Sequence, residues 1–341
     1  MQALPKVELH VHLERALRFQ TVQRIDRNFT PARYVRELAG LPTMRRRDYI
    51  ARRCAALALL QSEEALRLAV KDLAQQLTED GVIYAEIRLA PFLYTRRGLS
   101  PENVVRCVVD SLNRAYHDTR LDAHLILCTV HTASAIESES VAYLVERFQG
   151  LRVVGFGLME DPCSTAPVSD GAWSLETHLP AFTATLEKGL PRVVDADETV
   201  GAARLWDMVQ LYVPRRVGHA LPCAAHFGVQ KLLREADTHL ELCPMRSVQL
   251  GLFPDMENYP LNAWYRAGHS LSINTDGRVT TPVTLSELYE TLQNRYGWRM
   301  QELLACNLMA VEASFAPRQT KARLRAALRE AYLPRGREKR R

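Results

Sequence analysis

His10 and His12 stand two residues apart at the end of a short apolar run that begins at Lys6. Successive side chains of a β-strand point to opposite faces, so residues two apart project to the same side. Both imidazoles can therefore reach one metal ion, which histidine nitrogens bind at about 2.0–2.1 Å. The same spacing also occurs between ordinary polar residues, so the pattern needs support from the rest of the chain.

Three further segments place acid, base or ligand residues directly after predicted strands. Asp195 and Glu198 follow one such run, His219 follows the next, and Asp276 follows the last. Carboxylates and imidazoles at neighbouring strand ends are the groups that bind metal ions and transfer protons in active sites. Two of them have structural alternatives, Glu198 as a helix cap and His219 as a hydrogen-bonded core histidine. Together, the four strand ends favour a metal-dependent catalytic site.

The elements that must position these residues are eight short runs rich in β-branched residues, separated by helical patterns. The predicted strands are Lys6–Leu9, Val82–Arg88, Ala123–Val130, Arg152–Gly157, Arg192–Val194, Arg216–Gly218, His239–Leu242 and Ser270–Asn274. Eight alternations of strand and helix favour an α/β fold with a closed parallel (β/α)8 barrel, the TIM barrel. No GxGxxG loop follows the first strand, which argues against a dinucleotide-binding sheet. In such barrels the active site lies at the carboxyl ends of the strands.

We interpret residues 1–341 as a single barrel domain, because no linker or change of composition divides them. The interval 18–77 is too long for one crossover helix and includes helical patterns at Asp48–Leu60 and Glu63–Leu77. We expect it to form a helical lid that gates the substrate and excludes water. Residues 334–341 form a basic tail, for which a solvated chain end is the simplest interpretation.

Composition and charge limit the partners. The net charge of +5, from 44 basic and 39 acidic residues, predicts a small-molecule substrate rather than nucleic acid. No apolar run approaches the roughly 20 residues that span a bilayer, and the N-terminus lacks a signal-peptide pattern, which predicts a cytoplasmic protein without a membrane partner. The seven cysteines are scattered without CxxC spacing, so neither a disulfide framework nor a zinc finger is expected. The oligomeric state is not predicted.

Five segments of the chain resemble the adenosine deaminase family and its adenine-deaminase relatives, over a region from about Leu4 to about Leu328. The matching segments are Leu4–Leu13, Asp80–Arg88, Arg216–His219, Cys243-Pro244 and Ser272–Asp276. The resemblance implies a metal-dependent amidohydrolase barrel that removes an amino group from a purine by hydrolysis. It also implies Zn2+ as the cofactor, with Mn2+ or Fe2+ as other divalent candidates.

The resemblance also implies roles for individual residues. His10, His12 and Asp276 resemble metal ligands, and Asp276 resembles the group that accepts a proton from the attacking water. Glu198 resembles the glutamate that protonates the ring nitrogen beside the reacting carbon. His219 resembles the histidine that orients the water and stabilises developing negative charge.

One ligand position departs from the family. The family signature Val-His-Ala-Gly-Glu is here Val194-Asp195-Ala196-Asp197-Glu198, so Asp195 stands where a histidine ligand is expected. A carboxylate still binds divalent ions, but a set of two histidines and two aspartates makes the ion a weaker Lewis acid and suits harder ions such as Mn2+. Loss of the metal is the alternative consequence.

Other departures fall on the predicted substrate pocket. Glu14 and Arg15 replace the family's acidic residue and glycine, Glu160 replaces a glycine, and Gly277 with Arg278 follows Asp276 where a second aspartate is expected. Because glycines are kept where backbone approaches a ligand closely, these changes predict a substrate other than plain adenosine. Arg15, with help from Arg278, predicts recognition of an acidic group on the substrate. An ion pair between Arg15 and Glu160 that fills the purine site is the competing interpretation.

Three functions remain open. The first is a deaminase-like hydrolase acting on another amino-substituted heterocycle. The second is a catalytically inactive homologue that serves as a binding or regulatory protein. The third is a lyase or isomerase that uses the carboxylates on the same barrel. Retention of Glu198, His219 and Asp276 favours an active enzyme, whereas Asp195 argues against one.

Overall fold

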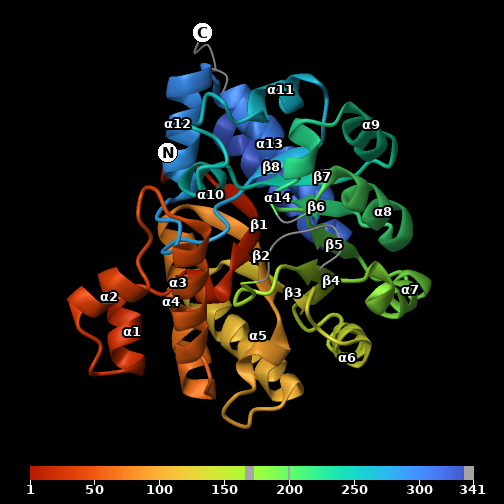
Figure 1. The fold of residues 1–341 in the computed structure, drawn as a ribbon. Coiled ribbons are helices and arrows are strands. Elements are labelled where there is room, and N and C mark those ends of the chain that lie inside the picture. Colours follow the sequence, from red (N-terminus) through yellow and green to blue (C-terminus); the bar gives the residue numbers. More distant parts are fainter. Residues whose placement is uncertain (166–172, 199, 334–341) are drawn as a thin grey trace.

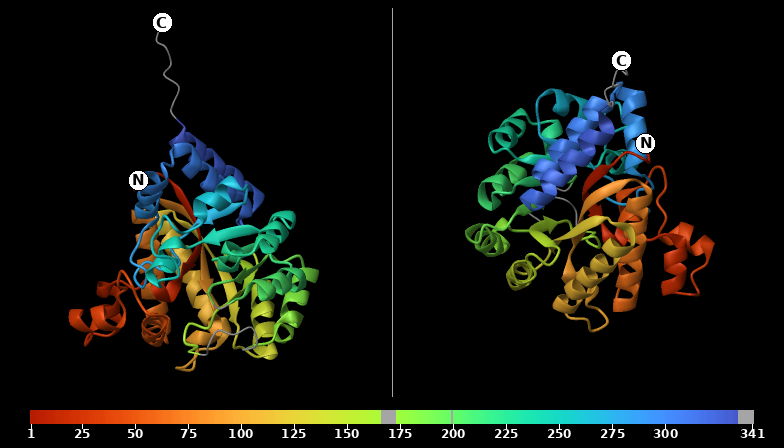
Figure 2. Two further views of the ribbon diagram at one scale, coloured as in Figure 1. Left: turned by 45° about the horizontal axis from the view of Figure 1, so that its top comes forward. Right: turned by 180° about the vertical axis from the view of Figure 1, so that it is seen from behind.

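The computed structural model describes residues 1–165, 173–198 and 200–333. Eight parallel strands follow one another around a single sheet in the order β1 to β8, as predicted for a (β/α)8 barrel. Figures 1 and 2 show these strands in the middle of the molecule with helices around them. The strands are β1 (Lys6–His12), β2 (Val82–Leu89), β3 (Asp122–Val130), β4 (Val153–Met159), β5 (Arg192–Asp195), β6 (Arg216–Gly218), β7 (His239–Leu242) and β8 (Leu271–Ile273).

The helices connect successive strands and surround the barrel. They are α1 (Phe19–Ile25), α2 (Pro31–Glu37), α3 (Arg46–Leu59), α4 (Glu63–Glu79), α5 (Pro101–Thr119), α6 (Ala135–Arg147), α7 (Leu179–Glu187), α8 (Ala202–Tyr212), α9 (Phe227–Glu235), α10 (Pro244–Gln249), α11 (Leu261–Arg266), α12 (Leu285–Tyr296), α13 (Met300–Ala313) and α14 (Arg318–Tyr332). Four short 3-10 helices are η1 (Leu13–Arg15), η2 (Pro91–Tyr94), η3 (Leu175–Thr177) and η4 (Leu221–Ala224).

The barrel closes beside the predicted metal ligands. Val11 of β1 forms a parallel bridge with Asp276, which follows β8. The backbone N–H of His12 donates to the carbonyl of Asp276, and the N–H of Asp276 donates to the carbonyl of His10, both at 3.0 Å. Closure of the barrel therefore fixes the three residues relative to one another before any side chain is considered.

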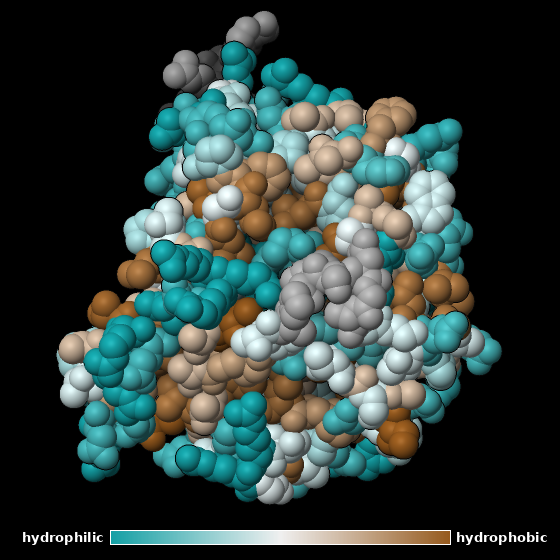
Figure 3. All heavy atoms as spheres, viewed as in Figure 1, coloured by the Kyte–Doolittle hydropathy of each residue, from teal (hydrophilic) through white to brown (hydrophobic). Residues whose placement is uncertain are grey.

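The helices of the expected lid interval, residues 18–77, lie in three different places. Helix α4 packs against β2 and α5 as an ordinary barrel helix, whereas α1 and α2 project from one side of the molecule. Helix α3 packs on η1, directly after β1, so it lies over the strand ends that carry the predicted site. In Figure 3 a band of hydrophilic side chains lies over α3. The basic tail predicted at 334–341 lies outside the described residues.

The cysteine prediction was wrong in one respect. Cys54 on α3 and Cys163, beyond the end of β4, form a disulfide with their Cα atoms 5.3 Å apart. The two positions are separated by 109 residues in the sequence, so spacing along the chain gave no sign of the pair. The five other cysteines are free and buried. No helix among the described residues is long and apolar enough to cross a membrane.

Candidate active site

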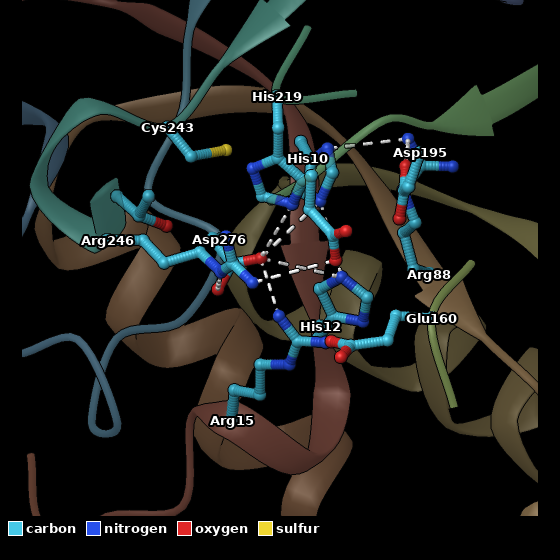
Figure 4. A network of polar contacts seen from close by, with 12 residues as sticks. His10, His12, Arg15, Arg88, Glu160, Asp195, His219, Cys243, Arg246 and Asp276 are labelled. Atoms are coloured by element: carbon cyan, nitrogen blue, oxygen red, sulfur yellow. Dashed lines mark hydrogen bonds and ion pairs between the residues drawn. The ribbon is translucent and has the colours of Figure 1, made fainter. Parts of the chain in front are cut away.

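Three predicted metal ligands converge at the carboxyl end of the barrel. The Nε2 atoms of His10 and His12 lie 3.3 Å apart. They lie 3.5 and 3.7 Å, respectively, from Oδ1 of Asp276. All three side chains are buried and point toward one another (Figure 4).

This arrangement fits a divalent ion. Donor atoms that each lie about 2.0–2.1 Å from one tetrahedral ion are separated by roughly 3.3–3.4 Å, close to the spacing observed here. Burial and the nearby Arg15 lower the pKa of His12 to about 4, so its ring is neutral and offers a lone pair at neutral pH. The Nδ1 atom of His10 faces Oε2 of Glu241 at 2.9 Å, and such a partner fixes the tautomer that leaves Nε2 free for a metal.

Asp195 reaches the same region from β5 but has a competing partner. Its Oδ1 atom lies 3.1 Å from the guanidinium of Arg88. Ligand atoms of Asp195, His10 and His219 lie within 4.8 Å of one another, as do those of His10, His12 and Asp276. The structure thus brings Asp195 to the site, but its carboxylate forms an ion pair with Arg88. Its role as a metal ligand stays a prediction.

Asp276 is held as a carboxylate by two neighbours. Arg15 donates to its Oδ1 at 2.6 Å, and the Tyr49 hydroxyl on α3 donates to its Oδ2 at 2.8 Å. Burial raises the pKa of Asp276, but Arg15 and His10 outweigh it, so the pKa lies well below its usual value. Asp276 is therefore ionised at neutral pH, and Arg15 is a cation that shares the oxygen facing the two histidines.

Glu198 and His219 are both influenced by Arg246 on α10. The guanidinium donates to the two carboxylate oxygens of Glu198 at 2.7 and 3.2 Å. Burial, and next the charge of Arg246, place the pKa of His219 well below its usual value, so its ring is neutral. The Nε2 atom of His219 lies 3.7 Å from Oδ1 of Asp276. Glu198 thus lies at the site, but an arginine holds both its oxygens.

Two residues of the site have unusual backbone conformations. His219 and Asp276 have φ values of 61° and 64°, in the left-handed region that non-glycine residues rarely adopt. Such conformations cost about 1–3 kcal/mol each and cluster at functional sites. His219 directly follows β6, and Asp276 lies three residues beyond β8, so both occur where the chain leaves a strand at the barrel mouth.

Comparisons with known proteins match nearly the whole chain. The family model "Adenosine deaminase" matches residues 5–331. The chain belongs to the adenosine deaminase family. An adenosine deaminase of Enterococcus faecalis is 28% identical over 98% of both chains.

Two solved structures are similar in fold to this chain over nearly its whole length. Arabidopsis ADAL complexed with IMP has a TM-score of 0.85 and 19% identity, covering 97% of this chain and 98% of that one. A Burkholderia ambifaria amidohydrolase with bound Zn has a TM-score of 0.82 and 21% identity, covering 97% of this chain and 91% of that one. Membership of the adenosine deaminase family makes the chain a hydrolytic deaminase by family, and the two solved structures share its fold.

In this adenosine deaminase family member, Glu160 contacts helix α3 rather than Arg15. Arg53 of α3 donates to Oε2 of Glu160 at 2.7 Å, and Arg46 donates to its Oε1 at 2.5 Å. Burial raises the pKa of Glu160, but Arg53 and other arginines lower it to a greater extent. The interpretation that Arg15 pairs with Glu160 was therefore wrong, because Arg15 pairs with Asp276, and two arginines of α3 neutralise Glu160.

The remaining predicted substrate residues divide between the site and the barrel wall. Glu14 lies beside His12, its Oε1 3.5 Å from Nδ1, and accepts a hydrogen bond from Tyr94 at 3.0 Å. Gly277 packs directly against Arg15. Arg278 points away from the site. Its guanidinium binds Oδ2 of Asp80 at 2.7 Å and Oε2 of Glu8 at 3.3 Å. The prediction that Arg278 helps to recognise the substrate is corrected accordingly.

Sequence reasoning missed five residues that shape this candidate site. Each is a charged or hydroxyl group that neutralises or orients a predicted site residue: Arg46, Tyr49, Arg53, Arg88 and Arg246. The sequence indicates that three of them act together: positions 46, 49 and 53 are spaced three and four apart, so they share one face of helix α3. Arg88 ends a buried strand, where an unpaired charge is costly and a partner must exist.

Proposed function

We propose that this chain is a metal-dependent aminohydrolase that acts on a purine-like heterocycle carrying an acidic group, and that plain adenosine is not its preferred substrate. The observation that carries the proposal is the convergence of donor atoms of His10, His12 and Asp276 at 3.3–3.7 Å in a buried site. His219 lies beside them with a neutral ring. Glu198 is held at the same mouth of the barrel by its hydrogen bond with Arg246.

His10, His12 and Asp276 are the residues that would hold the metal, with Asp195 as the proposed fourth ligand. When bound, a divalent ion there would supply a Lewis acid that makes water more acidic at neutral pH. Zn2+ suits the two imidazoles, and a neighbour of the same fold carries bound Zn. The carboxylates of Asp195 and Asp276 keep Mn2+ and Fe2+ as alternatives.

The chain's own residues define the acid and base steps. Asp276 is ionised and accepts a proton, while neutral His219 accepts or donates a hydrogen bond beside it. Glu198 can protonate a ring nitrogen only after its ion pair with Arg246 separates and the carboxylate has itself taken up a proton, because both of its oxygens already accept hydrogen bonds. Substrate binding therefore has to rearrange Arg246 or Glu198.

Arg46 replaces Arg15 as the candidate for recognising an acidic group. Arg15 is buried and bound to Asp276, whereas the Arg46 side chain is 29% exposed and contacts Glu160 at the mouth. Its Nε is buried, has no hydrogen-bond partner among the residues that the structure describes, and lies 3.6 Å from Glu198. The neighbour bound to IMP, a nucleotide with a phosphate group, supports an acidic ligand for this chain.

A non-catalytic binding protein is the second candidate. The observation that favours it is the 2.6 Å contact between Arg15 and Oδ1 of Asp276, because a guanidinium on a ligand oxygen can neutralise the carboxylate in place of a metal. The same pocket would then bind an acidic heterocycle without turning it over.

Ammonia release from a panel of adenine, adenosine, AMP and N6-methyl-AMP tests the proposal. We expect release from an acidic member in the presence of Zn2+ or Mn2+, and loss of release in Glu198→Gln, which keeps the shape but cannot deliver the proton. IMP binding by calorimetry tests the acidic-group contact: Arg46→Ala should weaken it, while Arg47→Ala, an exposed neighbour paired only weakly with Asp48, should not. Binding of IMP without ammonia release from any member would favour the binding-protein candidate.

A further inference from the structure

A covalent cross-link joins the lid helix to the rim of the barrel. Cys54 lies on α3, and Cys163 follows β4 just beyond Glu160 and Asp161. Both cysteines are partly exposed, whereas the five others are buried, so this pair is the one that redox reagents can reach. Their Cα separation of 5.3 Å lies within the usual range for disulfides, about 4.4–6.8 Å.

The cysteine at the rim belongs to a turn that is anchored to the barrel. The N–H of Cys163 donates to Oδ1 of Asp161 at 2.8 Å, and Thr132 donates to Oδ2 of the same aspartate at 2.7 Å. The N–H of Asp161 donates to the ring of His131, beyond β3, at 3.1 Å. The disulfide therefore attaches α3 to a fixed part of the molecule rather than to another loose segment.

The cysteine on α3 lies beside the residues that close the site. Its chain neighbour Arg53 donates to Oε2 of Glu160 at 2.7 Å and to the carbonyl of Asp161 at 3.3 Å. One turn earlier, Tyr49 donates to Oδ2 of Asp276 at 2.8 Å. Arg53 and Tyr49 are each 1% exposed, so both side chains are packed into the mouth. A substrate that reaches Asp276 must displace this face of α3.

We propose that Cys54 and Cys163 form a reversible redox latch that holds α3 closed over the active site when oxidised and lets it open when reduced. Non-covalent contacts of α3 can break and re-form as the helix moves, but a disulfide limits the two Cα atoms to a narrow range of separations. Reduction leaves the hydrogen bonds of Tyr49 and Arg53 in place and removes only this limit.

The chemistry balances with glutathione disulfide as the oxidant. The thiolate of one cysteine attacks a sulfur of glutathione disulfide, forms a mixed disulfide and releases one glutathione thiolate. The second cysteine, as its thiolate, attacks the protein sulfur of the mixed disulfide and releases the second glutathione. Two protein thiols are oxidised, one glutathione disulfide is reduced to two glutathiones, and the two thiol protons go to the released thiolates.

Hydrogen–deuterium exchange of the full chain tests the latch without knowledge of the substrate. The protein is equilibrated with glutathione disulfide or with a phosphine reductant, the Cys54–Cys163 link is followed by peptide mass spectrometry, and exchange is measured in peptides covering residues 46–59. We expect amides of α3 to exchange at least about tenfold faster after reduction, because local opening is no longer restrained. Peptides from α5 serve as an internal reference that should not change.

Variants separate the latch from general effects of thiol reagents. Cys54→Ser and Cys163→Ser should show fast α3 exchange under both conditions, while Cys107→Ser, at a buried cysteine outside the pair, should respond as the unmodified protein does. The proposal is overturned if glutathione disulfide fails to join Cys54 to Cys163, or if the link forms and α3 exchange is unchanged. If one serine variant does not fold, the unmodified protein in its two redox states gives the same decision.

Discussion

A Cβ atom placed on Gly277 would lie 2.8 Å from the Cβ of Arg15 and 2.6 Å from Oγ1 of Thr280. The two residues depart from the family pattern together, one by gaining a side chain and the other by losing one. The contact gives a physical reason for the combination, because the space beside Arg15 cannot also hold the first atoms of an aspartate at position 277. The guanidinium of Arg15 then reaches Asp276, the residue before that glycine.

A double-mutant cycle tests this coupling. Gly277→Ala alone should destabilise the fold by about 1–3 kcal/mol, because it forces a methyl group into a packed site. In an Arg15→Gly background the cost should fall, since the Cβ contact at 2.8 Å is gone. Urea unfolding of the four proteins measures the interaction free energy, and strictly additive effects would show that the two positions are independent.

Arg15 should stabilise the protein mainly when no metal is bound. Arg15→Ala leaves Asp276 as a buried carboxylate without its closest cation, and breaking such a pair costs about 3–5 kcal/mol. Added Zn2+ should recover much of this loss by replacing the missing charge. Thermal unfolding with and without Zn2+ measures both effects. Arg67→Ala is the control, because its ion pair with Glu63 is exposed and should be worth no more than about 1 kcal/mol.

The barrel was predictable because its signals are local. Strand β6 was predicted at Arg216–Gly218 as observed, and β1 was predicted three residues short, ending at Leu9 instead of His12. The extension has a simple cause. The end of β1 pairs with β2 on one side and bridges to Asp276, beyond β8, on the other, whereas polar residues at a strand end look like a loop in sequence. The placement of the candidate site residues at strand ends followed directly from the fold.

The partners of those residues were not predictable in the same way. Arg246 meets Glu198, and Arg53 meets Glu160, across 48 and 107 residues of sequence. The sequence around these residues does not specify which arginine pairs with which glutamate, because any arginine at the mouth can neutralise a buried carboxylate there. For this reason the prediction that Arg278 contacts the substrate was wrong. It directly follows Gly277, yet its side chain turns to Glu8 and Asp80 in the barrel wall.

His239 should make stability fall as the pH is lowered. Burial lowers its pKa from the ordinary 6.5 to about 3, and its ring nitrogens lie 2.8 and 2.9 Å from the hydroxyls of Ser270 and Ser272. Above pH 6.5 neither state binds the proton. Below it the unfolded chain does and the folded chain does not, so the free energy of unfolding falls by about 1.4 kcal/mol per pH unit.

His239→Asn should remove that contribution. Between pH 6.5 and 5 the unmodified protein should lose about 2 kcal/mol more than the variant. Denaturant unfolding at a series of pH values measures the difference. Parallel profiles for the two proteins would mean that His239 is not held neutral by the fold.

Adenosine should be a poor substrate. Gly277 offers no side-chain acceptor, and Glu160 with its two arginine partners from α3 occupies the mouth. A lost buried hydrogen bond to substrate costs roughly 1–3 kcal/mol, about tenfold to a hundredfold in turnover. Ammonia release from adenosine should therefore be at least that much slower than from the best acidic substrate, and rapid turnover of adenosine would contradict this account of the pocket.

The metal content of the purified protein tests the central claim most directly. Elemental analysis after dialysis against Zn2+- or Mn2+-containing buffer, then against metal-free buffer, measures what the site retains. The account predicts close to one equivalent of a divalent metal in the unmodified protein and a large loss in His12→Ala, whose ring supplies one of the three converging donors. A folded, unmodified protein that retains no metal would contradict it, and would leave Arg15 as the charge that neutralises Asp276.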